Sequence, residues 1–527
     1  MRRVWQSTVI FPDYMYRGQI EEMSYLKIFW GNDLLDTTQG LDILGIRGFD
    51  QSIEIGMVNG ITTISQRVRY LSILTWALGE VLIQKSTTGA KWEEVEKFLR
   101  RVEFLVLAAT RLDKEINGAD AVGTLGTNLL QEDINALLNG ADVSIPDDKG
   151  GAILGTYLGP CRATGLLVDG EAPVFYRLTP RGKEIWEARN RQIATSPLVM
   201  LLHEGGSLTR GVAETAIPDF SLAALSQRTE EATLLWAALT TPWSPVDEAS
   251  QTRVDAAYNG LIGTIDWASA LLEEQPDTAT GVITRNYEKC CNSLEQDRVS
   301  ATWAEYEYRR RCHLSLELLL SALTRGLANH EEATIFQIVM DWSREPDVSN
   351  FLTAMWPDAT GVWGMPAGEA IGSVPKGLFL GAPMPTGDLR HLPPLDQVLA
   401  AVGILSATAK QTAAMRSARR IDMRSAMPGD QAVGVVEKAT DEPVTALIEE
   451  LLHIAAIAHL QTTLRKMGGE QKCSLRFFPE GPVLRPTGLG MTPGHSGDRL
   501  TNVLKFLTDL GILDATENGL APADGAF

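Results

Sequence analysis

A carboxylate and a lysine with the spacing of a metal-dependent nuclease site lie in the C-terminal part of the chain. Glu470 and Lys472 stand two positions apart, immediately before the predicted strand 474–478. A cation held by such a carboxylate would activate water for phosphodiester cleavage, but it needs a second acid from a neighbouring strand. Asp441 could supply that acid only if the helix between them folds back. The pattern gives one enzyme hypothesis, a metal-dependent nuclease.

Other catalytic signatures are absent or incomplete. The phosphate-binding pattern Gly-x-x-x-x-Gly-Lys-Ser/Thr occurs nowhere in the chain. The segment 494–497, Gly-His-Ser-Gly, resembles a hydrolase nucleophile elbow, but Asp498 replaces the last glycine and no strand precedes it. The histidines are dispersed, and the helical pair Glu449 and His453 fits a surface or core-edge position better than a metal site. We predict no metal and no cofactor, and we favour a non-catalytic protein over the nuclease.

Basic residues near two predicted hairpins are the candidates for phosphate contacts. If they share a face, they would neutralise several phosphates and make binding steeply salt-dependent. Against DNA binding, residues 497–527 hold two basic and five acidic residues, a net charge of −3, and the whole chain carries −19. Double-stranded DNA and a partner protein both stay open as ligands. The C-terminal candidates are Arg465, Lys466, Lys472, Arg476, Arg485, Arg499 and Lys505, and the earlier hairpin contributes Arg177 and Arg181.

The densest basic run, the three arginines 309–311, has two interpretations. On a helix the run could clamp a phosphate group. Glu305 and Glu307 are close enough along the same helix to form salt bridges with it instead. We favour the salt-bridged helix.

The elements that must position these residues begin with the segment after residue 497. Apolar residues follow helical spacing over 500–510, Gly511 supplies a stop, and two short apolar strands flank the turn 517–519. A helix that leads into such a hairpin is typical of a winged-helix module, which binds DNA or a partner protein. Residues 146–195 predict a second module, in which two strands around an Asp-Gly turn precede a helix with Thr179 as its cap and Pro180 at its first position.

Most of the remaining chain has helical periodicity. Helices are predicted over 62–78, 91–112, 395–427 and 444–467, whereas dense Pro and Gly over 346–397 predict short, interrupted helices. The predicted fold class is mainly α with small α+β modules, a multi-domain helical protein with two winged-helix-like modules. Its predicted parts are an aromatic arm (1–35), a helical domain (36–145), a winged-helix-like module (146–195), a second helical domain (196–345), an irregular region with a basic helix (346–440) and a C-terminal winged-helix-like module (441–527).

Composition limits the class of protein. Of the 527 residues, 44% are hydrophobic and 21% are charged, as in ordinary soluble proteins, and no apolar run is long enough to cross a membrane. The first residues lack the apolar stretch of a secretion signal, so we expect a cytoplasmic protein. The five cysteines lack the paired spacing of a zinc or disulfide framework, which indicates reduced, structural thiols.

Four segments carry a resemblance to a protein family: 60–76, which reads Gly-Ile-Thr-Thr-Ile-Ser-Gln-Arg-Val-Arg-Tyr-Leu-Ser-Ile-Leu-Thr-Trp, the Tyr-Glu-Tyr-Arg-Arg-Arg of 306–311, 459–466 and 499–511. They resemble large, uncharacterised helical and winged-helix proteins of bacterial antiviral defence clusters. The resemblance implies a non-catalytic subunit of a multi-protein antiviral-defence or DNA-transaction complex. Its partner subunits would be a separately encoded helicase, nuclease or ATPase. A transcriptional regulator is a third possibility, disfavoured by the size of the helical domains.

Overall fold

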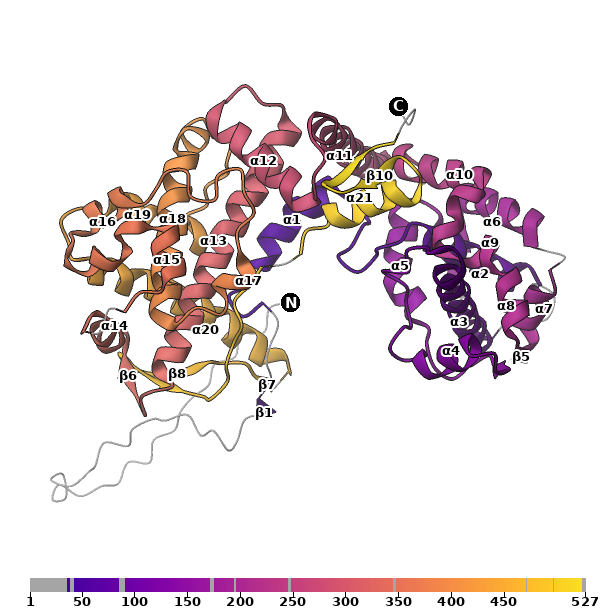
Figure 1. The fold of residues 1–527 in the computed structure, drawn as a ribbon, viewed down its shortest axis with the longest axis horizontal. Coiled ribbons are helices and arrows are strands. Elements are labelled where there is room, and N and C mark those ends of the chain that lie inside the picture. Colours follow the sequence, from indigo (N-terminus) through magenta and orange to yellow (C-terminus); the bar gives the residue numbers. More distant parts are fainter. Residues whose placement is uncertain are drawn as a thin grey trace, which may run out of the picture.

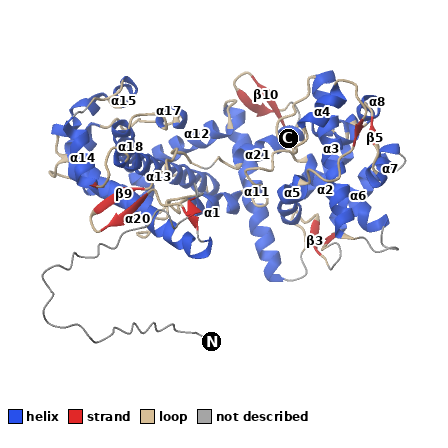
Figure 2. Cartoon of the chain, turned by 90° about the horizontal axis from the view of Figure 1, so that it is seen from below, coloured by secondary structure: helices blue, strands red, loops and turns tan. Residues whose placement is uncertain are grey.

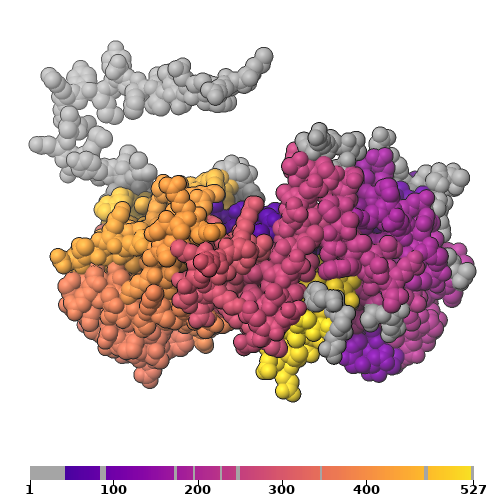
Figure 3. All heavy atoms as spheres, turned by 90° about the horizontal axis from the view of Figure 1, so that it is seen from above, coloured from indigo at the N-terminus to yellow at the C-terminus, as the bar shows by residue number. Residues whose placement is uncertain are grey.

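The computed structural model shows a mostly helical chain folded into two lobes (Figure 1). In the space-filling view, the earlier (purple) and later (orange) parts of the chain lie at opposite ends of the molecule (Figure 3). Helices dominate the molecule and the strands are few and short (Figure 2). The mainly α class is therefore confirmed, whereas the predicted arm over 1–35 lies outside the described part of the chain. The described residues are 36–37, 42–84, 91–170, 175–193, 196–244, 248–344, 347–470, 472–495 and 497–523.

The first lobe surrounds α2 (Arg69–Gln84) and α3 (Trp92–Asn117), whose apolar faces fill its core. Trp76 at the centre of α2 is fully buried and its ring meets Phe98 and Phe220. Burial of these large rings is the main source of stability in such a core. The other elements of this lobe are α4 (Gln131–Leu138), β2 (Val143–Ser144), α5 (Ala152–Ala163), β3 (Leu167–Asp169), β4 (Tyr176–Leu178), α6 (Pro180–Ile193), α7 (Pro197–Glu204), β5 (Ser207–Leu208), α8 (Arg210–Thr215), α9 (Ile217–Phe220), η2 (Leu222–Gln227) and α10 (Thr229–Thr240).

The second lobe is built around α13 (Arg298–Leu327) and α18 (Pro394–Ser417), which are buried on nearly all sides. Asp297 caps α13 by accepting hydrogen bonds from the backbone N–H groups of Val299 and Ser300. The surrounding elements are α12 (Ala279–Asn292), β6 (Ala333–Thr334), α14 (Ile335–Arg344), α15 (Asn350–Met355), η3 (Pro357–Gly364), α16 (Ala367–Ser373), α17 (Thr386–Leu389), α19 (Pro428–Lys438), α20 (Val444–Glu470), β8 (Phe477–Glu480) and β9 (Val483–Pro486). A short parallel pair joins β1 (Asp36–Thr37) to β7 (Lys472–Cys473).

Three helices occupy the middle of the molecule, between the lobes: α1 (Arg47–Met57), α11 (Glu248–Glu274) and α21 (Leu500–Asp509) (Figure 1). The antiparallel hairpin of β10 (Leu513–Thr516) and β11 (Gly519–Pro522) follows α21. Although α21 comes directly after the last strand of the second lobe, its apolar residues belong to the core of the first lobe. The segment 441–527, predicted as one module, therefore contributes to both cores.

Both predicted hairpins are present. β3 pairs with β4 from Leu167 and Leu178 to Asp169 and Tyr176, and β10 pairs with β11 across a tight turn between Thr516 and Gly519. In the described part of the chain each of these sheets has two strands. The helix and hairpin components are thus present, but the winged-helix assignment itself remains a prediction.

Two helices are long and apolar enough to be compared with membrane spans, among the residues that the structure describes. They are Pro394–Ser417 and Val444–Met467, and the apolar windows are 83% and 50% buried inside the fold. Both supply side chains to the core of the second lobe. This burial is typical of core helices in a soluble protein.

Candidate docking and nucleic-acid site

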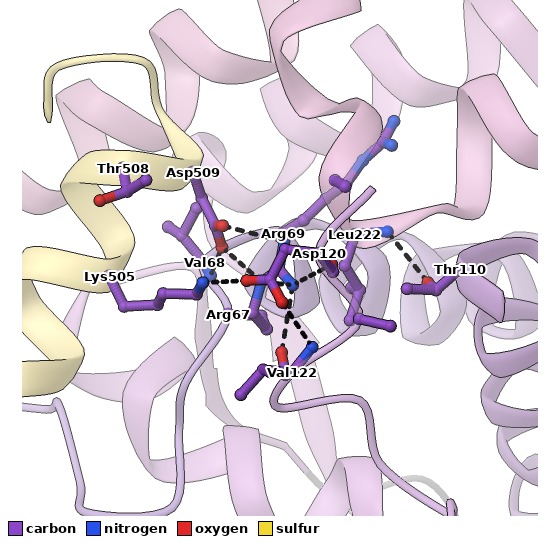
Figure 4. A network of polar contacts seen from close by, with 12 residues as sticks. Arg67, Val68, Arg69, Thr110, Asp120, Val122, Leu222, Lys505, Thr508 and Asp509 are labelled. Atoms are coloured by element: carbon purple, nitrogen blue, oxygen red, sulfur yellow. Dashed lines mark hydrogen bonds and ion pairs between the residues drawn. The ribbon is translucent and has the colours of Figure 1, made fainter. Parts of the chain in front are cut away.

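The junction of α21 with the first lobe is held by a buried ion pair (Figure 4). Arg67 Nη2 lies 2.9 Å from Asp509 Oδ1, and the side chains are 2% and 4% exposed. Asp509 also accepts a hydrogen bond from the backbone N–H of Val68 at 3.2 Å. Arg67 donates in addition to the carbonyls of Asp120 and Val122. The chain before α2, the loop at 120–122 and α21 are thereby joined at one point.

Lys505, a candidate for DNA contact, belongs to the same junction. Its ammonium group donates to Asp120, a carboxylate that is 44% exposed. Burial acts to raise the pKa of Asp120, but the hydrogen bond from Lys505 and the nearby positive charges outweigh it and lower that pKa. At Asp509 the balance is reversed, because burial raises the pKa despite Arg67. The positive charge of Lys505 is thus neutralised within the chain by its ion pair with Asp120.

Arg499 is similarly engaged. Its guanidinium donates to the carbonyl of Ile61 at 3.1 Å and lies 3.6 Å from Glu54. Glu54, fully buried on α1, accepts from the Arg499 backbone N–H and from the Tyr306 hydroxyl, each at 2.7 Å. Burial raises the pKa of Glu54. In this arrangement Arg499 serves as an internal partner of a buried carboxylate.

The remaining C-terminal candidates do not form one cationic face. Arg476 is buried, with 2% exposure, and donates to the carbonyl of Ser474. Arg485 pairs with Glu480 at 3.0 Å. On α20, Arg465 is exposed, and Lys466 donates to a backbone carbonyl. The predicted set is therefore divided between buried, internally paired and exposed positions.

The nuclease hypothesis falls on side chains that lie outside the described part of the structure. Glu470 is the last residue of α20 and Lys472 the first of β7, so the backbone places a helix end and a strand start there. Among the described residues, no group of three or more His, Cys, Asp and Glu side chains is placed to hold a metal ion.

The arginine run 309–311 is almost entirely buried and salt-bridged, the interpretation that we favoured. Arg309 meets Glu305 at 2.9 Å and Asp430 at 3.0 Å, and Arg311 meets Glu307 at 3.0 Å. Their exposures are at most 5%. The run joins α13 to α19 inside the second lobe, so it offers no phosphate clamp in this structure. Asp430 could not have been identified as a partner from helical spacing.

In the first lobe, Arg177 and Arg181 differ in environment. Arg177 is exposed on β4. Arg181, in the first turn of α6, donates to the Thr241 carbonyl at 2.8 Å and to the Thr164 carbonyl and Tyr258 hydroxyl at 3.1 Å. The structure brings both to one cavity, which is described below.

A larger groove lies beside the α21 junction. Its volume is about 600 Å³, and it runs between α21, the hairpin β10–β11, the loop at 120–122 and the start of α12. Leu504, Leu520, Ala279 and Ala515 supply its apolar lining, while Asp120 and Asp277 are its carboxylates. Val122, also in the lining, is 66% exposed. The groove offers an apolar surface next to acidic groups.

Sequence reasoning missed the residues that build this junction, Arg67, Asp509 and Glu54. One signal was present, because Arg67 and Arg69 flank Val68 at the start of an apolar helix where charged residues would be buried.

Comparisons with known proteins add no further constraint: no family model, curated protein or solved structure matches the chain.

Proposed function

We propose that the protein is a non-catalytic docking subunit of a multi-protein complex, with α21 and the hairpin β10–β11 as a winged-helix-like docking module. The observation that carries the proposal is the groove beside α21, with its apolar lining and exposed Val122. Concave, mostly apolar clefts in proteins commonly serve as binding sites. The antiviral-defence setting and a cytoplasmic location are consistent with this role and remain part of the proposal.

The charges around the groove favour a basic protein segment as the occupant. Asp120 and Asp277 line it, and Asp514 and Glu517 are exposed on the adjoining hairpin. Lys505, the cation of the lining, is already paired with Asp120. A partner segment that combines apolar side chains with lysine or arginine would complement this surface. DNA is disfavoured at the same place, because Arg499 and Lys505 are held by acidic groups of the chain.

The test begins with a photo-crosslinking residue at Val122 in the full chain, expressed in its native cell. Met200 on α7, 61% exposed, is the matched control position. The captured partner is then purified and its affinity measured for Val122→Glu and Met200→Glu. We expect a basic partner whose binding weakens at least tenfold with Val122→Glu and is unchanged with Met200→Glu.

Equal binding by both variants, or crosslinking at Met200 but not at Val122, would contradict the docking assignment. Fluorescence anisotropy with single- and double-stranded DNA over a salt series forms the second arm. If no protein partner is captured and DNA binds Val122→Glu as well as the wild type, the proposed function changes from protein docking to nucleic-acid binding. Mg²⁺-dependent cleavage of that DNA would instead support the nuclease alternative at Glu470 and Lys472.

A further inference from the structure

A second cavity, of about 520 Å³, lies in the first lobe between the hairpin β3–β4, the start of α6 and the segment after α10. Val168, Leu178 and the prolines 180 and 242 form its apolar walls. Trp243, half-buried, supplies an aromatic ring, and Arg177 and Arg181 supply two guanidinium groups. Its size is within the range of small-molecule sites.

The position of Trp243 is fixed by two features of the chain. Gly165 has a φ of +66°, and a Cβ atom there would lie 2.2 Å from Cγ of Trp243, so the indole occupies space that only glycine leaves free. Arg181 donates to the carbonyls of Thr241 and Pro242, the two residues before the tryptophan. The aromatic wall is therefore held in place before any ligand binds, which reduces the entropic cost of binding.

The two arginines of the cavity differ from neighbouring cations in their ion pairing. Arg162 pairs with Asp169, Lys183 with Glu187 and Arg191 with Glu230. Within the described ranges, by contrast, Arg177 has no ion-pair partner, and Arg181 donates to neutral oxygens alone. Among the described side chains, therefore, no carboxylate is paired with either arginine.

The start of α6 adds to the positive potential. Thr179 and Pro180, at the first turn of this fourteen-residue helix, line the cavity. The N-terminal end of a helix carries a partial positive charge that favours anions. An aromatic ring, apolar walls and two arginines thus line one cavity.

We propose that this cavity binds a nucleoside phosphate unit. Its base stacks on Trp243 between the apolar walls, the exposed guanidinium of Arg177 pairs with the phosphate, and Arg181 supplies a fixed charge. A ligand of this class joins a flat ring to an anion, and arginine recognises phosphate through paired N–H donors. The same unit can be a free nucleotide or the 5′-phosphorylated end of a nucleic-acid strand.

Calorimetric titration of the full chain with AMP, GMP, CMP and UMP tests the proposal, with adenosine and inorganic phosphate as partial ligands. We expect saturable binding of at least one nucleotide. Arg177→Ala should weaken it about tenfold or more, since a hydrogen bond to a charged group contributes about 1.5–3 kcal/mol. Trp243→Leu should weaken nucleotide and adenosine binding alike. Lys183→Ala, which removes an exposed cation of the same helix outside the cavity, is the matched control.

Absence of saturation with every nucleotide at millimolar concentration would overturn the proposal. So would binding that Arg177→Ala and Lys183→Ala reduce equally, or AMP binding no tighter than that of adenosine. Competition by 5′-phosphorylated and 5′-hydroxyl oligonucleotides then shows whether the ligand is a free nucleotide or the end of a nucleic-acid strand. Displacement by the phosphorylated strand alone assigns the site to a strand end, and no displacement assigns it to a free nucleotide. The result is independent of the docking groove, because Val122→Glu leaves this cavity untouched.

Discussion

Arg67 and Asp509 are joined by two contacts of 2.9 Å, although 442 positions separate them in the sequence. Their pair is buried where α21 meets the first lobe (Figure 4). A buried ion pair contributes little net stability, but loss of one partner leaves an uncompensated charge away from water. The integrity of the C-terminal junction therefore depends on both residues.

Substitution of Asp509 should weaken this junction strongly. Asp509→Asn keeps the shape but removes the charge that Arg67 needs, so we expect the free energy of unfolding to fall by about 3–5 kcal/mol. Lys505→Ala is the control, because its pair with half-exposed Asp120 should contribute about 1 kcal/mol or less. Denaturant unfolding and limited proteolysis of the segment after residue 497 measure both changes. Similar small losses in the two variants would contradict the role of the buried pair.

His313 should stay protonated at neutral pH. Its ring lies 2.7 Å from Asp50 and 3.2 Å from Glu317. Although burial lowers the pKa, the hydrogen bonds to the two carboxylates outweigh it and raise the pKa to about 10 from the usual 6.5. Because the folded-state pKa is the higher one, this stabilisation is complete below pH 6.5 and is lost as the pH rises through 10. NMR titration of the imidazole should show this, and His313→Gln should remove this loss of stability at high pH. An imidazole that titrates near pH 6.5 would refute the assignment.

Glu231 should contribute to stability with the opposite pH dependence. It lies 3.0 Å from Arg69 and 2.5 Å from Arg189 in the core of the first lobe. Burial acts to raise the pKa of Glu231, but the two arginines outweigh it and lower the pKa to about 2 from the usual 4.5. Its stabilisation is therefore present above pH 4.5 and lost as the pH falls through 2. Unfolding midpoints measured between pH 5 and pH 2 should fall less steeply in Glu231→Gln than in the wild type. Parallel curves would exclude this residue as a source of acid sensitivity.

Two glycine substitutions in helices should act in opposite directions. A Cβ atom at Gly182 in α6 would lie 2.1 Å from the carbonyl oxygen of Leu166, a backbone atom that has little room to move. Gly182→Ala should lower the free energy of unfolding by about 1–3 kcal/mol. Gly155 in α5 has no atom within 4 Å of such a Cβ, and Gly155→Ala should raise stability by up to about 1 kcal/mol. Thermal unfolding measures both changes. Stabilisation by Gly182→Ala would show that the backbone at Leu166 can shift away and would contradict the prediction.

Elements with regular apolar spacing could be predicted from the sequence. The helices predicted over 91–112 and 444–467 correspond to α3 and α20, and the segment 500–510 forms α21 with Gly511 at a φ of +73°. Local patterns suffice for α3 and α21 because one face of each helix is apolar, whereas α20 could be recognised by its long, generally apolar sequence. The helix predicted over 395–427 ends earlier, at Ser417, because Arg419 adopts a left-handed φ of +55° and Pro428 starts a separate helix.

The environments of the charged residues could not be predicted in the same way. Arg499 contacts Glu54 from 445 positions away, and Arg309 contacts Asp430 from 121 positions away. A cation held by a distant carboxylate has the same local sequence as one exposed to solvent, so candidates for phosphate contact could be proposed but not placed. Arg177 and Trp243 meet at one cavity for the same reason, through the fold and without any shared motif.

The return of α21 to the first lobe has a consequence for synthesis of the protein. Leu500, Val503, Leu504 and Leu507 complete a core whose other members begin at Met57. During translation, the apolar residues that α21 covers therefore stay exposed until the second lobe has been synthesised. A ribosome that stalls before residue 500 would release a chain with this surface exposed, which chaperones and proteases recognise. The position of α21 thus makes completion of the first lobe dependent on prior synthesis of the second lobe.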